Sequence, residues 1–186
     1  DEMIKIWDPA RISKSPAIFD PLKLRAINAA YIRALPAEEF RKLADPFIDQ
    51  AVHVQIDRDL LCANLQPRCE VLEDIPPQLD FFDAVLPIDA EMYRNKKQKT
   101  TPESAKEALS ALLPVLEAQT DWSRDAIFEA CKQKAEAMEK KNGWLLFPLG
   151  IALSGKARTP GGGTDLAAMM GKEETLRRLN AAIEAL

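Results

Sequence analysis

The chain has 186 residues, of which 47% are hydrophobic and 29% charged, a balance typical of globular domains: one large domain or two small ones. No apolar run approaches the roughly 18 residues of a membrane span and no signal-peptide pattern opens the chain, so we expect a cytoplasmic protein without membrane contact. The net charge of −4 is unevenly divided: residues 1–92 carry 10 Lys and Arg against 17 Asp and Glu, and residues 93–186 carry 15 against 12.

Helical signals dominate the first half. Asp20-Pro21 puts a capping residue before a proline suited to a first turn, and predicts a helix that runs through Tyr31. Pro36 opens a second predicted helix, which Pro46 should end or kink because proline lacks the backbone donor. The other predicted elements of this half are a short helix over 57–65 stopped by Pro67 and a turn that begins at Pro76-Pro77.

The second half has longer helices with clearer starts. Thr101-Pro102 and Ser123 are typical capping residues, and each precedes an apolar stripe at helical spacing. Asn142-Gly143 should end the second of these helices, with Gly143 in the left-handed conformation. The remaining predicted elements are a buried apolar helix or turn over 145–153, a short helix over 165–170 stopped by Gly171, and a closing helix over 172–186.

These elements predict an all-α fold of two helical subdomains, residues 1–92 and residues 93–186, which meet at the polar run 94–100. The basic clusters of the second half are either a phosphate-binding face or ordinary solvated helix surface. The cysteines at 62, 69 and 131 are odd in number and lack metal-type spacing, so we expect three reduced thiols and no metal site. Because the chain begins at Asp1, we expect it to be a piece of a longer protein.

One motif suggests a nucleotide-binding loop. Gly150, Gly155 and Lys156 reproduce the spacing G-x-x-x-x-G-K, in which backbone amides and a lysine hold phosphates. However, Ala157 stands where a magnesium-binding hydroxyl is required, and Pro148 interrupts the strand that should precede the loop. The pattern therefore gives this interpretation little weight.

Two longer blocks carry a resemblance. The first is Ser13-Lys14-Ser15-Pro16-Ala17-Ile18-Phe19-Asp20; the second includes Ile151 to Lys156, Thr159-Pro160-Gly161-Gly162 and Gly171-Lys172-Glu173-Glu174. In these blocks, and over nearly its whole length, the chain resembles the C-terminal, anticodon-binding portion of bacterial glutamyl-tRNA synthetases. That family is enzymatic, with ATP and magnesium used in an N-terminal catalytic half.

The resemblance implies specific site residues. Arg68, directly after Pro67, matches the family arginine that reads the third anticodon base, and Thr159 and Pro160 match a Thr-Pro at the anticodon pocket. Lys156 and Arg158 could neutralise RNA phosphates, although the loop over 154–163 could equally be a plain connector and Arg68 a surface arginine paired with Glu70 or Glu73. The family commonly has an arginine where this chain has Gly150, so its choice between glutamate and glutamine anticodons stays open.

No catalytic residue is expected, because the single histidine, His53, lies in no synthetase motif, and Ile12-Ser13-Lys14-Ser15 falls outside the family's active loop. The implied function is therefore anticodon recognition within a glutamate–tRNA ligase. Its partners would be tRNA(Glu) and its own N-terminal catalytic half, without DNA or a membrane. A helical protein-interaction module and a P-loop-like nucleotide-binding protein are the alternatives. Five aromatic residues could stack on bases: Trp7, Phe19, Trp122, Trp144 and Phe147.

Overall fold

The computed structural model describes residues 2–11 and 18–186, and the predicted all-α class is confirmed: these residues form helices and no strand longer than an isolated bridge between Asn95 and Thr100. The block Ser13–Ala17 lies outside the described residues. The α-helices are α1 (Glu2–Ile6), α2 (Pro21–Ala34), α3 (Ala37–Ile48), α4 (Arg58–Leu65), α5 (Pro102–Ala118), α6 (Arg124–Ala137), α7 (Asn142–Ser154), α8 (Gly163–Met170) and α9 (Lys172–Ala185). Five 3₁₀ turns are η1 (Pro9–Arg11), η2 (Gln66–Arg68), η3 (Leu72–Asp74), η4 (Pro76–Gln78) and η5 (Ala90–Tyr93).

The predicted helix starts are confirmed by capping hydrogen bonds. Asp20 Oδ1 accepts from the backbone N–H groups of Leu22 and Lys23 at 3.0 and 3.2 Å, and the Ser123 side chain caps α6. Thr101 and Ser104 cap α5 reciprocally, since each side chain accepts from the other's backbone N–H. These caps involve residues at most three apart, and each satisfies donors that a helix start leaves unpaired.

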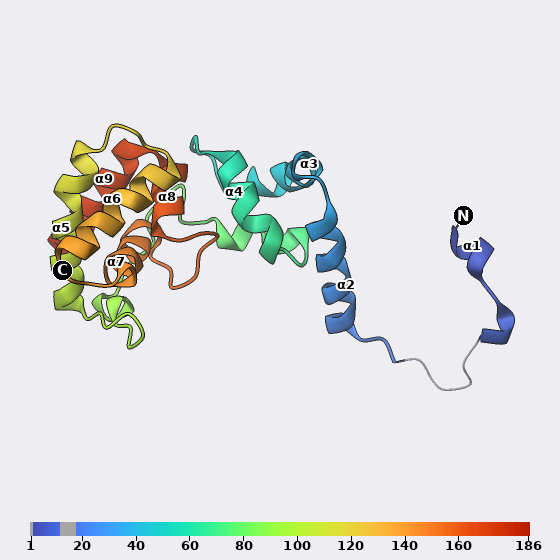
Figure 1. The fold of residues 1–186 in the computed structure, drawn as a ribbon. Coiled ribbons are helices and arrows are strands. Elements are labelled where there is room, and N and C mark those ends of the chain that lie inside the picture. The colour runs from blue at the N-terminus through green and yellow to red at the C-terminus, as the bar shows by residue number, and fades with distance from the viewer. Residues whose placement is uncertain (1, 12–17) are drawn as a thin grey trace.

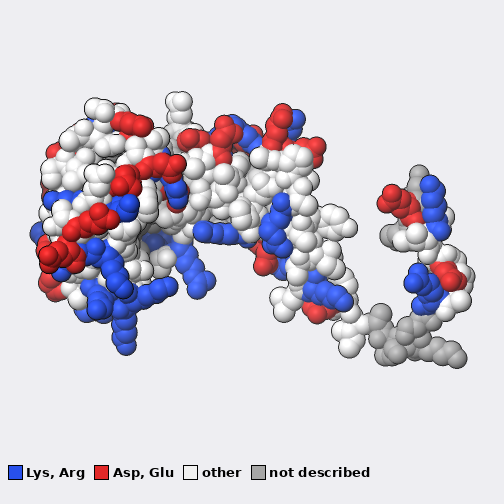
Figure 2. Space-filling model, viewed as in Figure 1, with Lys and Arg blue, Asp and Glu red and all other residues white. Residues whose placement is uncertain are grey.

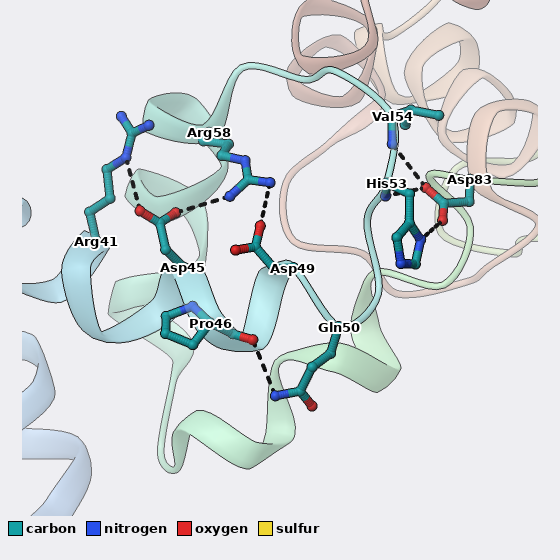
Figure 3. A network of polar contacts seen from close by, with 9 residues as sticks. All are labelled: Arg41, Asp45, Pro46, Asp49, Gln50, His53, Val54, Arg58 and Asp83. Carbon is teal, nitrogen blue, oxygen red and sulfur yellow. Dashed lines mark hydrogen bonds and ion pairs between the residues drawn. The ribbon is translucent and has the colours of Figure 1, made fainter.

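The sequence predicts that Pro46 ends or kinks its helix. Pro46 does not end the helix, because α3 continues to Ile48. Phe40, Ala44 and Ile48 are fully buried along one face of α3, and this packing outweighs the single backbone donor that proline removes. Figure 3 shows the polar contacts around this helix end: Arg58 donates to Asp49 at 2.6 Å, and so joins α3 to the start of α4.

α2–α4 and α5–α9 form two adjoining helical bodies (Figure 1). At the centre of the second body lies α7, which contacts α5, α6, α8 and α9. The segment over 145–153, predicted to be a buried apolar helix or turn, is a helix, and it begins three residues earlier, at Asn142. Leu145, Leu149 and Leu153 are completely buried, as expected for a helix surrounded by others.

The turn before α7 differs from the prediction. Gly143 does not stop α6; it lies in the first turn of α7, and Glu139 has the positive φ of 55° that reverses the chain. A Cβ at Gly143 would lie 1.9 Å from Oε1 of Gln98, so the glycine accommodates the neighbouring 95–100 turn. Close packing between distant segments, rather than local backbone need, explains this glycine.

Two cations of the second body hold the segment over 77–82, which follows α4. The buried Arg178 of α9 donates to the carbonyl oxygens of Phe81 and Phe82, each at 2.7 Å. Lys156, just after α7, donates to the carbonyl oxygen of Pro77 at 2.8 Å and forms an ion pair with Asp80. These contacts cross the boundary at residue 92, and the division into two subdomains there stays a prediction.

Candidate nucleic-acid interface

A cleft of about 600 Å³ lies between the two bodies. One wall is Arg68, at the end of η2, and Gln78, in η4; the other is the loop over 156–163 that joins α7 to α8. Arg68 Nη1 donates to the carbonyl oxygen of Thr159 at 3.3 Å. The cleft thus brings together two segments that are about 90 positions apart in the chain.

The loop is held by its own hydrogen bonds. Gly155 ends α7 with φ of 66°, and a Cβ there would lie 2.9 Å from Leu86. The Ser154 hydroxyl donates to the Gly150 carbonyl at 2.7 Å and accepts from Lys156 N–H at 3.0 Å. Further along, Thr159 Oγ1 donates to the Gly161 carbonyl at 2.8 Å. A connector with this many internal contacts presents a defined surface.

Four of the five predicted site residues line this cleft, namely Arg68, Lys156, Arg158 and Thr159, whereas Pro160 is buried outside its lining. The Lys156 ammonium is held by the protein, because it contacts Pro77 and Asp80 and lies 6.0 Å from the Phe81 ring. Its positive charge is therefore partly compensated within the protein.

The two arginines of the cleft are both exposed. Neither Arg158 nor Arg68 forms an ion pair with another described residue. The alternative pairing of Arg68 with Glu70 is not what the structure shows, since Glu70 binds Arg25 at 2.9 Å. Both guanidinium groups are thus available to planar hydrogen-bonding partners such as base edges and phosphates.

The floor of the cleft is apolar. Phe147 and Leu146 of α7 are half-buried there, and Gly150 lies one turn further along the same helix. A Cβ at Gly150 would meet Gly163 N at 3.7 Å, an ordinary contact, so the position could carry a side chain. Sequence reasoning named Phe147 as a stacking candidate but missed Gln78 and Leu146, because only the folded chain brings η4 beside α7.

The other aromatic candidates lie elsewhere. Trp144 is 6% exposed beneath Lys140, whose ammonium is 5.1 Å from the ring. Trp122 donates its ring N–H to the Ala167 carbonyl at 2.9 Å. Trp7 and Phe19 are exposed, and neither lines the cleft. Of the five, Phe147 is the aromatic residue that meets the predicted site residues.

His53 is a surface residue away from the cleft. Its Nδ1 lies 2.5 Å from Asp83, whose other oxygen accepts from His53 N–H at 2.7 Å. The side-chain contact with His53 is the main reason that the pKa of Asp83 is lowered. The pair joins the segment after α3 to the segment before η5 (Figure 3).

The nucleotide-loop alternative does not fit the geometry. Gly150 lies inside α7 and Lys156 follows the end of that helix, whereas a phosphate-binding loop follows a strand and opens a helix. In residues 2–11 and 18–186, no group of three or more His, Cys, Asp or Glu could hold a metal ion, and no helix has the length and apolarity to cross a membrane.

The three cysteines form no disulfide and are all buried. Burial raises the pKa of Cys62 to about 11 and that of Cys131 to about 12, which keeps both thiols protonated near neutral pH. The expectation of three free thiols is confirmed.

Comparison with known proteins gives consistent matches. A family model described as "Anticodon binding domain" matches residues 28–183. Glutamate–tRNA ligases of Clostridium botulinum and Clostridium acetobutylicum are both 41% identical over the whole chain, which spans 38% and 39% of their respective lengths. A crystal structure of a glutamate tRNA ligase from Elizabethkingia meningosepticum, in complex with its amino acid, matches all of this chain and 36% of that one with 27% identity and a TM-score of 0.83. A glutamate-tRNA synthetase structure from Elizabethkingia anophelis has 25% identity, covers 98% of this chain and 35% of that one, and gives a TM-score of 0.74.

Proposed function

Because the chain belongs to the anticodon-binding domain family, we propose that it recognises the anticodon of tRNA(Glu) as part of a glutamate–tRNA ligase. The observation that carries the proposal is the contact between Arg68 and the Thr159 carbonyl, which closes a cleft lined by guanidinium groups and an apolar floor. Sequence-specific recognition of RNA targets unstacked bases of single-stranded loops, and an anticodon is such a segment.

Each cleft residue has a distinct part in this proposal. Arg68 donates to the edge of the third anticodon base, and its contact with Thr159 holds the guanidinium at the cleft wall. Phe147 stacks against a base on the cleft floor. Arg158, exposed on the loop, neutralises a backbone phosphate. Lys156 anchors the same loop through its contacts with the Pro77 carbonyl oxygen and the Asp80 carboxylate, and does not touch RNA directly.

The reaction itself belongs, in this proposal, to the remainder of a longer protein. The chain spans 38% of the length of its Clostridium botulinum relative, and that remainder would use ATP and magnesium to join glutamate to the tRNA. One face of α2 fits a role in contacting it. Leu24 and Tyr31, seven residues apart and therefore on the same side of that helix, are 52% and 73% exposed and form with Ile27 a row of uncovered apolar side chains. Anticodon recognition would then hold the acceptor end in register with a distant cytoplasmic active site.

Binding of transcribed tRNA(Glu) to the chain tests the proposal. We expect salt-dependent binding that weakens when the third anticodon base is changed. Arg68→Ala should lower affinity for the cognate anticodon by about 1–3 kcal/mol and abolish the difference between third-base variants. Arg33→Ala, which removes an exposed arginine from α2, is the matched control and should preserve that difference.

Equal binding of cognate and third-base variants by the unmutated chain would contradict base recognition in the cleft. A complete absence of salt-dependent RNA binding would favour the alternative of a helical protein-interaction module.

A further inference from the structure

Four lysines surround the start of α7. Lys97 and Lys99 come from the 95–100 turn, and Lys140 and Lys141 precede the helix; together with Trp144 and Gln98 they line a groove of about 350 Å³. Glu139 is the one acidic residue in this lining. We refer to Lys97, Lys99, Lys140 and Lys141 as the lysine cluster.

A tight turn over 95–100 holds two lysines of the cluster in place. Asn95 and Thr100 exchange backbone hydrogen bonds at 3.1 Å, and Asn95 Oδ1 accepts from the backbone N–H groups of Lys97 and Gln98 at 3.0 and 3.1 Å. Lys99 completes this turn with φ of 56°. The absence of a Cβ at Gly143 lets Gln98 rest against α7, which seats the turn on the helix start. The backbones of Lys97 and Lys99 are therefore fixed before any ligand arrives.

The local field favours an anion. None of the four lysines forms an ion pair with another residue in the described part of the chain, and Lys140 is held over the Trp144 ring. The first turn of α7 has no side-chain cap, so its N–H groups and the positive end of its dipole add to the cluster. Figure 2 shows Lys and Arg gathered at the lower edge of the body that contains α5–α9.

The cluster and the cleft lie along the same helix. Trp144 and Gly150 are six residues apart on α7, roughly 9 Å at 1.5 Å per residue. A nucleic-acid strand with one phosphate per about 3.4 Å of helix axis covers that distance within about three nucleotides. A strand with a base in the cleft therefore needs only a few nucleotides to cover the distance to the lysine cluster.

We propose that the lysine cluster is a second contact site for the same RNA, which binds the phosphodiester backbone beside the anticodon and contributes affinity without sequence preference. This inference rests on the proposed function, since it assigns the cluster to the strand whose base occupies the cleft. Charged side chains that contact phosphates position a nucleic acid, whereas contacts with base edges specify it.

The test compares two triple variants of the chain. Lys97→Gln/Lys140→Gln/Lys141→Gln removes three cluster charges and leaves Lys99, with its positive φ, unchanged. Lys23→Gln/Lys42→Gln/Lys132→Gln removes three charges from α2, α3 and α6 and is the matched control. Affinities for transcribed tRNA(Glu) and a third-base mutant are measured across a salt series, and circular dichroism checks that each variant is folded.

We expect the cluster variant to bind both RNAs at least tenfold more weakly, and by the same factor. The slope of log affinity against log salt should become less steep by about 2, because each phosphate contact on a single strand contributes about 0.7 to it and three contacts are removed. The control should keep the unmutated affinity and slope. Lys97→Arg/Lys140→Arg/Lys141→Arg, which keeps the charges, should retain the slope.

Three results would overturn the inference. If the cluster variant matches the control while the unmutated chain still distinguishes the two RNAs, anticodon recognition stands and the cluster is not a contact site. If the cluster variant loses that distinction selectively, the lysines read a base and are not a neutral backbone site. If the unmutated chain binds neither RNA, the proposed function and this inference fail together.

Discussion

Replacing Arg178 by methionine should strongly destabilise the protein. The arginine side chain is completely buried, and its Nε donates to Glu174 at 2.6 Å. Its Nη1 donates to the carbonyl oxygens of Phe81 and Leu153 at 2.7 and 2.6 Å, and Nη2 donates to that of Phe82 at 2.7 Å. One guanidinium therefore satisfies acceptors on three separate segments.

Methionine fills much of the same space but cannot donate. Each buried acceptor left without a partner costs about 1–3 kcal/mol, and removal of one member of a buried ion pair costs about 3–5 kcal/mol. Because relaxation and entering water recover part of the sum, we expect a loss of about 3–5 kcal/mol in the free energy of unfolding. That is a large share of the roughly 5–15 kcal/mol by which most domains are stable.

Urea unfolding followed by circular dichroism measures the effect. With a slope of about 2 kcal/mol per molar, the midpoint should fall by about 1.5–2.5 M. Arg177→Met is the matched control, since Arg177 contacts the same Glu174 at 2.7 Å but has a side chain that is 60% exposed. Its cost should stay below about 1 kcal/mol. Equal losses for the two variants would refute the claim that the backbone acceptors make Arg178 important.

Three further predictions concern the cleft and the acid stability of α9. Gly150→Arg places a guanidinium in the cleft, where a Cβ would meet only ordinary contacts, the nearest at 3.7 Å. The variant should increase discrimination between glutamate and glutamine tRNAs by about 1–3 kcal/mol in a binding assay. Unchanged discrimination would contradict this prediction. Gly163→Ala puts a Cβ 2.8 Å from a backbone oxygen of α7, and should lower the free energy of unfolding by about 1–3 kcal/mol as measured by thermal unfolding. Gly162→Ala, where the nearest contact of the added Cβ is at 3.5 Å, should lower it much less. Similar losses for the two variants would argue against close packing of α7 and α8. Hydrogen bonding, first by Arg177, lowers the pKa of Glu174 from 4.5 to about 2, so the stability from this carboxylate is complete above its unfolded pKa and is lost as pH falls through the folded pKa. Unfolding measured between pH 5 and pH 2 should therefore show a weaker acid dependence for Glu174→Gln, and identical pH profiles would exclude this carboxylate as the cause.

Local signals located most helices. The capping residues Asp20, Thr101 and Ser123 act on neighbours at most three residues away, so their role is visible in the linear chain. The apolar stretch before Gly155 predicted a buried helix or turn, and the structure shows a buried helix. The wrong expectation for Gly143 has a nonlocal cause, since the glycine is explained by the nearby Gln98 side chain from a separate segment.

The chain by itself determined the all-α class, the capped starts of α2, α5 and α6 and the residue types suited to RNA recognition, because these depend on local spacing and on side-chain chemistry. Tertiary structure alone decided which cations face solvent. Arg178 and Arg177 are adjacent in sequence, yet the first is buried among carbonyl oxygens and the second is exposed. Lys156 contacts Pro77 and Asp80, whereas Arg68 reaches Thr159 across the cleft. Such pairings depend on how segments far apart in the chain pack, since a long cationic side chain settles where the folded surroundings supply acceptors.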